Sequence, residues 1–400
     1  MVYGWVVILW ALVYLGALVT IAHFGDNAGQ RILAGRLRPV FYALTLAVYC
    51  TSWTFLGSVG LASRTGFDFL PIYLGPILVF AFGWPLLARI VKIAKAQNST
   101  SIADMIAARY GKSEAVAAVV AIICLLGIVP YIALQLKAVS LTLELITAPG
   151  MSLEASGPAP VPFGDAALWV TVILAFFAIV FGTRNTDATK HQGGLMLAVA
   201  TESLVKLIAF IAVGAFTVWS MFDGWGDLAA RAIADPTIRH KLIFEPNAAT
   251  WIVTTIMSAF AIVLLPRQFH VLVVENRELG DVRRAAWLFP LYLVAINLFV
   301  VPIAVAGLLL LPGRINFDMT VLALPILAGS GAVVVIAVVG ALSAATAMVV
   351  VETVALGVMV SNDLVIPALL KRHTRSRNDR GDNQPVDGLA PRRVGALGDM

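Results

Sequence analysis

The sequence is poor in charged residues and in cysteine, and both shortages narrow the class of protein. Charged residues make up 13% of the 400 residues, whereas an ordinary soluble domain carries roughly 25%. A soluble chain of this length needs a charged surface, so the shortage favours a protein whose surface faces lipid. The two cysteines, Cys50 and Cys124, both lie in apolar segments and provide neither a disulfide framework nor a metal-ligand spacing.

Sequence motifs of soluble enzymes are missing as well. The chain has no phosphate-binding loop, no G-x-S-x-G string and no glycine fingerprint for a dinucleotide. The net charge of +5 comes from basic residues in short loops between apolar segments, a pattern typical of membrane orientation rather than of nucleic-acid binding. We therefore expect no catalytic residues, no cofactor, no resident metal and no nucleic-acid partner.

Long apolar segments fill most of the chain. Hydrophobic residues make up 60% of it, and they recur in stretches of about 20, the length that crosses the hydrocarbon core of a bilayer. This pattern predicts an all-α, polytopic membrane protein with about nine spanning helices. We expect the spans at residues 3–23, 39–62, 68–90, 114–146, 166–182, 194–221, 250–270, 286–311 and 323–361.

The distribution of lysine and arginine predicts the orientation. Most of the 28 basic residues lie in loops that would share one side of the membrane. The positive-inside rule puts this side in the cytoplasm, with the N-terminus outside and the C-terminus inside. Residues 1–370 are predicted to form the membrane domain and residues 371–400 a disordered basic tail. A short helix over 101–111, capped by Ser99 or Ser101, is expected at the cytoplasmic surface.

Polar residues interrupt two of the predicted spans. Thr51, Ser52 and Trp53 precede glycines in the second span, and residues 266–270 (PRQFH) break the seventh. Unwound backbone is tolerated in a membrane only where it lines a protein cavity. Paired broken helices indicate a midplane binding site in transporters built from inverted repeats. A proline kink with satisfied hydroxyls is the alternative for either helix alone.

Several other polar residues lie within predicted spans, where they are costly. Tyr131 and Gln135 are four residues apart, so they share one face of the fourth helix. Lys137 and Glu144 also share a face, either as a neutralising pair or with a functional role. Glu352 is the lone acid of the ninth helix, and it either binds a proton or pairs with a basic residue elsewhere.

Glu202 and Lys206 lie four residues apart in the sixth span, with the acid first. This is the favourable order for an ion pair within one helix. We expect a structural pair here rather than a functional site.

Four sequence strings carry a family resemblance: CTSWTFLGSVG, PYIALQLKA, LLPRQFHVLVVEN and LSAATAMVVVETVALGVMVSNDL. They resemble the sodium/solute symporter family, most closely the transporter-like N-terminal module of bacterial sensor histidine kinases, often hybrid kinases. The resemblance extends from the first helix to about Ile366. It implies an inverted-repeat fold of five plus five helices preceded by one extra helix. It also implies that the second repeat is incomplete here, because the last two core helices of the family are absent. The kinase domains of the most similar relatives are absent as well.

The same resemblance implies a location and a set of partners. The chain would lie in the bacterial inner membrane as a multi-pass protein. Its partners would be the lipid bilayer, a small polar solute such as an amino acid, and a kinase domain or response regulator in a longer parent protein. The solute site would include Thr51, Ser52, Trp53 and Tyr131, with Gln135 beside them and with Gln268 and His270 at the seventh-helix break.

The coupling ion is where the sequence departs from the family. The family's sodium site uses backbone oxygens at the second-helix break and a hydroxyl pair in the ninth helix. That pair is replaced here by Ala347 and Met348, and a family aspartate becomes Tyr49. Ser343 and Thr346 lie nearby and would rebuild a sodium site in a shifted register. The other possibility is proton coupling, through Glu352 or, second, Glu144.

The sequence thus predicts a membrane module that binds a small polar solute, and either moves it across the membrane or reports its presence. One alternative is a working sodium-coupled symporter. Another is a membrane anchor or sensor region of a signalling kinase that binds no ligand.

Overall fold

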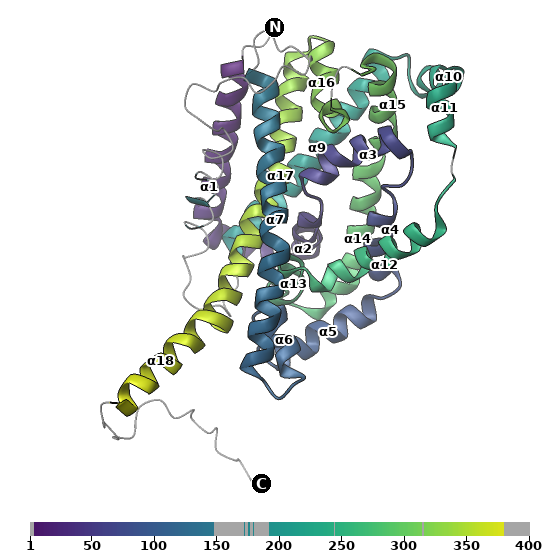
Figure 1. The fold of residues 1–400 in the computed structure, drawn as a ribbon. Coiled ribbons are helices and arrows are strands. Elements are labelled where there is room, and N and C mark those ends of the chain that lie inside the picture. Colours follow the sequence, from purple (N-terminus) through teal and green to yellow (C-terminus); the bar gives the residue numbers. More distant parts are fainter. Residues whose placement is uncertain are drawn as a thin grey trace.

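The computed structural model describes residues 4–147, 192–243, 245–313 and 316–379, with four isolated positions between 148 and 191. Every regular element in these residues is helical. Figure 1 shows an upright bundle in which the long helices α1 (Gly4–Ala34), α7 (Glu114–Thr147) and α17 (Gly331–Met359) lie side by side. Helices α10 (Trp225–Ala234), α11 (Pro236–Leu242) and α12 (Ala248–Leu264) lie on the side away from α1. The predicted all-α class is therefore confirmed.

The elements follow one another without strands over the described ranges. In chain order the α-helices are α1 (Gly4–Ala34), α2 (Arg38–Leu46), α3 (Ser58–Thr65), α4 (Pro71–Ala81), α5 (Trp84–Ala96), α6 (Ile102–Ala108), α7 (Glu114–Thr147), α9 (Gly193–Phe216), α10 (Trp225–Ala234), α11 (Pro236–Leu242), α12 (Ala248–Leu264), α13 (Pro266–Phe269), α14 (Leu279–Asn297), α15 (Val300–Leu310), α16 (Thr320–Leu327), α17 (Gly331–Met359) and α18 (Ile366–Asp379).

Membrane-spanning length is reached by both straight and bent elements. Within the described residues, five helices are long and apolar enough to cross a membrane, and the number rises to eight if each of three bent pairs is one span. The bent pairs are α2 with α3 (72°), α4 with α5 (75°) and α12 with α13 (54°). The fifth predicted span, at 166–182, lies outside the described residues apart from four isolated positions.

The prediction for the last span needs a correction. The sequence predicts one helix over 323–361, whereas the structure has α16 and α17 with a turn between them. Gly329 has a positive φ of 67° in this turn, a conformation that favours glycine and that ends α16.

The first part of the predicted disordered tail is helical instead. Helix α18 continues to Asp379 because no glycine or proline follows Pro367 until Gly381. Residues 380–400 lie outside the described residues. The short helix predicted over 101–111 is present as α6, with the Ser101 hydroxyl accepting a hydrogen bond from the Asp104 N–H at its first turn.

Helix α17 is the most buried of the spanning helices, with 72% of its apolar window inside the protein. It packs against α9, α7 and α1. At Gly340 it comes so close to its neighbours that an added Cβ would lie 2.6 Å from both Ala209 of α9 and Phe55 of the first interrupted helix. Small residues allow this close approach in membrane bundles, and α17 thereby reaches the helix break described next.

Candidate functional site

The first interrupted helix changes direction at Cys50 and Thr51. Helix α2 tightens into a 3₁₀ turn at Ala47–Tyr49, and Cys50 is extended, with φ −78° and ψ 101°. The chain resumes as a wide π-helical turn over Trp53–Gly57 and then as α3. The predicted break in the second span is therefore present. It leaves backbone carbonyl groups without their usual helical partners, a cost that other groups in the bundle must offset.

Helix α7 supplies polar partners for this break. The Thr51 and Tyr131 hydroxyl oxygens lie 3.3 Å apart. Ser52 donates to Gln135 Oε1 from both its backbone N–H (3.0 Å) and its hydroxyl (2.6 Å). The structure thus brings together the residues that the sequence places on one face of α7 and at the break, and apart from Tyr131 they are buried.

The second interrupted helix changes direction at Leu265, which is extended between α12 and α13. Arg267, directly after the break, donates a hydrogen bond from Nη1 to Glu352 Oε2 of α17 at 2.7 Å. Its guanidinium also lies over the Tyr131 ring, 5.1 Å from the ring centroid, a favourable cation–π arrangement. Gln268 donates to the Leu46 carbonyl oxygen of α2 at 3.5 Å.

These contacts join the two breaks through four side chains, Thr51, Tyr131, Arg267 and Glu352, which we call the junction cluster. Arg267 and Glu352 are almost completely buried, with side-chain exposures of 1% and 0%. Arg267 Nε and Glu352 Oε1 nevertheless have no hydrogen-bond partner among the described residues, and neither does Gln268 Oε1. Buried polar atoms of folded proteins are rarely left so, and a bound water or ligand is the usual explanation.

Glu352 pairs with a basic residue, Arg267. Such a pair was one of the two alternatives that the sequence left open. Arginine stays protonated in proteins, so its contact gives the Glu352 carboxylate a fixed counter-charge. This contact places Glu352 in the junction cluster.

A second buried polar group connects α9, α17 and the first break. Lys206 does not form the predicted self-contained pair but donates from Nζ to the carbonyl oxygens of Ala47 (3.0 Å) and Cys50 (2.6 Å). The Ser343 hydroxyl donates to the Glu202 carbonyl oxygen at 2.7 Å. The Thr346 hydroxyl donates to the Glu202 carboxylate.

Trp53 touches the junction cluster through its backbone N–H, which donates to Thr51 Oγ1 at 3.3 Å. The other candidates have partners outside it. His270 Nε2 is 3.6 Å from Glu275 Oε1, in the π-helical turn that follows α13. Glu144 accepts a hydrogen bond from the Ser140 hydroxyl on its own helix at 3.1 Å. It lies thirteen residues beyond Tyr131 along α7, a separation of about 20 Å in an α-helix. Trp53 is partly buried, with its ring 6.4 Å from that of Tyr73.

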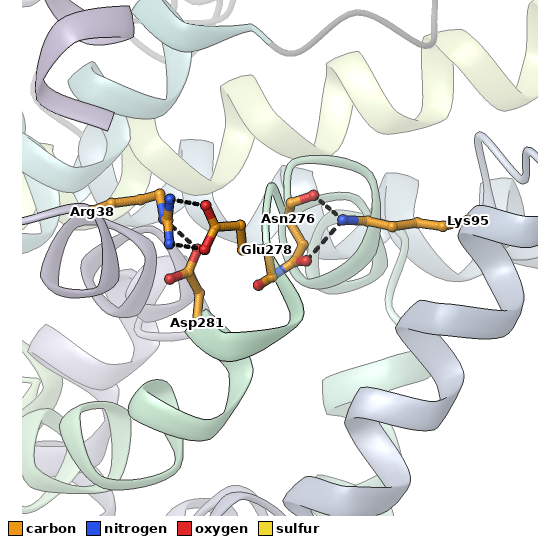
Figure 2. Close-up of polar contacts among 5 residues, drawn as sticks. All are labelled: Arg38, Lys95, Asn276, Glu278 and Asp281. Atoms are coloured by element: carbon orange, nitrogen blue, oxygen red, sulfur yellow. Dashed lines mark hydrogen bonds and ion pairs between the residues drawn. The ribbon is translucent and has the colours of Figure 1, made fainter. Parts of the chain in front are cut away.

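A further polar cluster lies where α2, α5 and α14 meet, and we call it the end cluster (Figure 2). Arg38, at the start of α2, forms ion pairs with Glu278 and with Asp281 of α14, the latter at 2.8 Å. Lys95 of α5 reaches across to the backbone oxygen and the side chain of Asn276. Figure 2 shows the two basic side chains approaching this segment from opposite sides. The end cluster fastens the segment between the second break and α14 to two helices of the first half of the chain.

Comparisons with known proteins agree with this architecture. Residues 32–230 match the model of the Sodium:solute symporter family. The chain is 25% identical over 295 residues to the "Uncharacterized symporter YodF" of Bacillus subtilis (strain 168). The matched region is 72% of this chain and 54% of that protein. The chain thus spans about half the length of this curated relative.

A solved structure shares the fold. It is described as the "Substrate-bound outward-open state of a Na+-coupled sialic acid symporter", and it superimposes with a TM-score of 0.59 at 15% identity over 91% of this chain and 74% of that one. The family match over residues 32–230 and the shared fold both agree with an all-helical, polytopic membrane-transporter fold.

Proposed function

We propose that the chain binds a small zwitterionic solute, such as an amino acid, at the junction cluster and moves it across the membrane. The observation that carries the proposal is the meeting of two interrupted helices at buried polar side chains that stay partly unpaired. In transporters built from inverted repeats, such breaks form the solute site near the bilayer midplane.

The charges of the junction cluster favour a solute of mixed charge. Arg267 offers an N–H donor at Nε, and Glu352 offers an acceptor at Oε1, beside the ion pair that they form with each other. A carboxylate of the solute would accept from the guanidinium, and its ammonium group would donate to Glu352. The hydroxyls of Thr51 and Tyr131, 3.3 Å apart, supply neutral partners. The cluster is closed in this structure, so solute entry requires movement of the helices around the breaks.

Binding of amino acids and their modified forms tests the proposed chemistry. The full chain in lipid nanodiscs is screened for thermal stabilisation by common amino acids, then by the methyl ester and the N-acetyl form of any that stabilise it. Each modification removes one charge, and hydrogen bonds to charged groups contribute about 1.5–3 kcal/mol. We expect each modified form to bind about 10- to 100-fold more weakly. Equal binding of the modified forms, or no stabilisation by any amino acid, would contradict the proposal.

Two alternative functions remain beside transport. One uses the same site for sensing, and the other is a membrane anchor that binds no ligand. In a signalling protein, occupancy of the junction cluster would be reported to a kinase domain or response regulator, as the sequence resemblance implies. Saturable uptake by the chain in liposomes supports transport, whereas binding without uptake supports sensing. An anchor without a ligand would show neither.

A further inference from the structure

The break in the first interrupted helix exposes backbone oxygens that need a positively charged or hydrogen-bonding partner. Cys50 is extended, so the carbonyl groups of the last turn of α2 are not all paired along the helix. The carbonyl oxygens of Ala47 and Cys50 both accept hydrogen bonds from the Nζ atom of Lys206. Lys206 has 0% relative exposure, so its side chain is committed to this contact.

The surroundings of this amine have the composition of a site for a hard cation. Carbonyl, hydroxyl and carboxylate oxygens are the ligands that such ions prefer. Here the carbonyls come from the break, the hydroxyls of Ser343 and Thr346 come from α17, and the Glu202 carboxylate lies one helical turn before Lys206 on α9. Each group already has a partner within the protein: the carbonyls accept from Lys206, and both hydroxyls donate to Glu202.

We infer that the amino group of Lys206 takes the place of a bound cation at the break, so that sodium does not bind there. The residues present therefore do not fit the sodium ion that the family name implies. Ala347 and Met348, which stand on α17 directly after Thr346, offer no oxygen ligand from their side chains.

Charge repulsion strengthens the inference. A sodium ion that shared these carbonyls would lie within about 4 Å of the Lys206 ammonium, and at an effective dielectric constant of about 20 this repulsion weakens binding roughly a thousandfold. Lys206 is covalently part of α9 and fully buried, so its amino group does not leave the site as a bound ion would. For the solute site proposed above, the consequence is binding that needs no sodium. The inference about the cation itself does not depend on the solute.

Sodium binding to the full chain in nanodiscs, without any solute, tests this inference. Radioactive sodium binding and the unfolding temperature in sodium chloride against choline chloride are measured for the wild type, Lys206→Ala and Lys206→Met. Alanine removes the charge and leaves room for an ion, whereas methionine removes the charge and fills much of the same space. Lys137→Ala, an exposed lysine of α7, is the matched control.

We expect no saturable sodium binding by the wild type, by Lys137→Ala or by Lys206→Met. Lys206→Ala should bind about one sodium ion per chain and gain a sodium-dependent rise in unfolding temperature. The inference would be overturned if the wild type binds about one sodium ion per chain saturably and Lys206→Ala leaves that binding unchanged or reduces it. Failure of a folded Lys206→Ala to respond to sodium would also overturn it, because the break would then be no cation site. If Lys206→Ala does not fold, the wild-type measurement decides alone.

Discussion

Replacing Glu352 by leucine tests how the two interrupted helices are held to α17. The Arg267–Glu352 pair is 2.7 Å long, and its side chains are 1% and 0% exposed. Removing one partner of such a pair leaves a buried charge uncompensated, which typically costs about 3–5 kcal/mol. Replacing both partners by apolar residues of similar size removes that cost. We therefore expect Glu352→Leu to lower the free energy of unfolding by about 3–5 kcal/mol, and the double variant Arg267→Met/Glu352→Leu to lower it by less.

The double variant should not recover completely. Arg267 also lies over the Tyr131 ring, and a buried cation–π contact contributes up to about 2 kcal/mol. Reversible unfolding of the chain in mixed micelles, followed by circular dichroism against denaturing detergent, gives the differences. Arg64→Ala is the matched control, since its 3.2 Å pair with Asp318 is exposed at 52% and 35%, and such pairs contribute about 1 kcal/mol or less. A Glu352→Leu cost equal to that of the control, or a double variant less stable than Glu352→Leu, would refute the reasoning.

Three further predictions address other parts of the structure. Gln135→Leu should lower the free energy of unfolding by about 1–3 kcal/mol, because it leaves the Ser52 N–H and hydroxyl without their shared acceptor; an unchanged unfolding midpoint would contradict this. Arg38→Gln should loosen the end cluster. A cysteine placed at Thr45, which lines a small pocket beside Arg38, should then react faster with a thiol reagent than the same cysteine in a chain that keeps Arg38. Equal rates would show that the cluster does not restrict access. In a chain without its native cysteines, Arg109→Cys should be labelled from the cytoplasm and His240→Cys from outside, and labelling from the same side would contradict the orientation predicted from the loop charges.

The fold was largely predictable because lipid imposes a simple pattern on the sequence. Apolar stretches of spanning length mark most helices, and Ser101 marks the start of α6 by the ordinary rules of capping. The end of α16 was harder to place, since Gly329 acts through a local positive φ that periodicity does not reveal. Helix α18 was missed because composition indicates disorder, whereas the helix needs only the absence of breakers after Pro367.

The candidate site was predictable in part. The breaks and the shared face of Tyr131 and Gln135 follow from spacing along single helices. The partners of charged residues do not, because they depend on how distant helices pack. Lys206 looked self-sufficient beside Glu202, yet its amine reaches the carbonyl groups of another helix. Arg267 gave a usable signal, an arginine inside an apolar span, but its pairing with Glu352 required the structure.

The central claim is that a solute binds at the junction of the two breaks. Equilibrium binding of the radiolabelled amino acid that stabilises the chain most, measured for the wild type and for Thr51→Val, tests it most directly. Valine keeps the shape of threonine and removes the hydroxyl that lies beside Tyr131 and accepts from the Trp53 N–H. Thr142→Val is the matched control, since among the described residues the Thr142 hydroxyl donates to the Ala138 carbonyl oxygen of its own helix and to nothing else. We predict about tenfold weaker binding by Thr51→Val and wild-type binding by Thr142→Val. Equal affinity of all three proteins would contradict the claim.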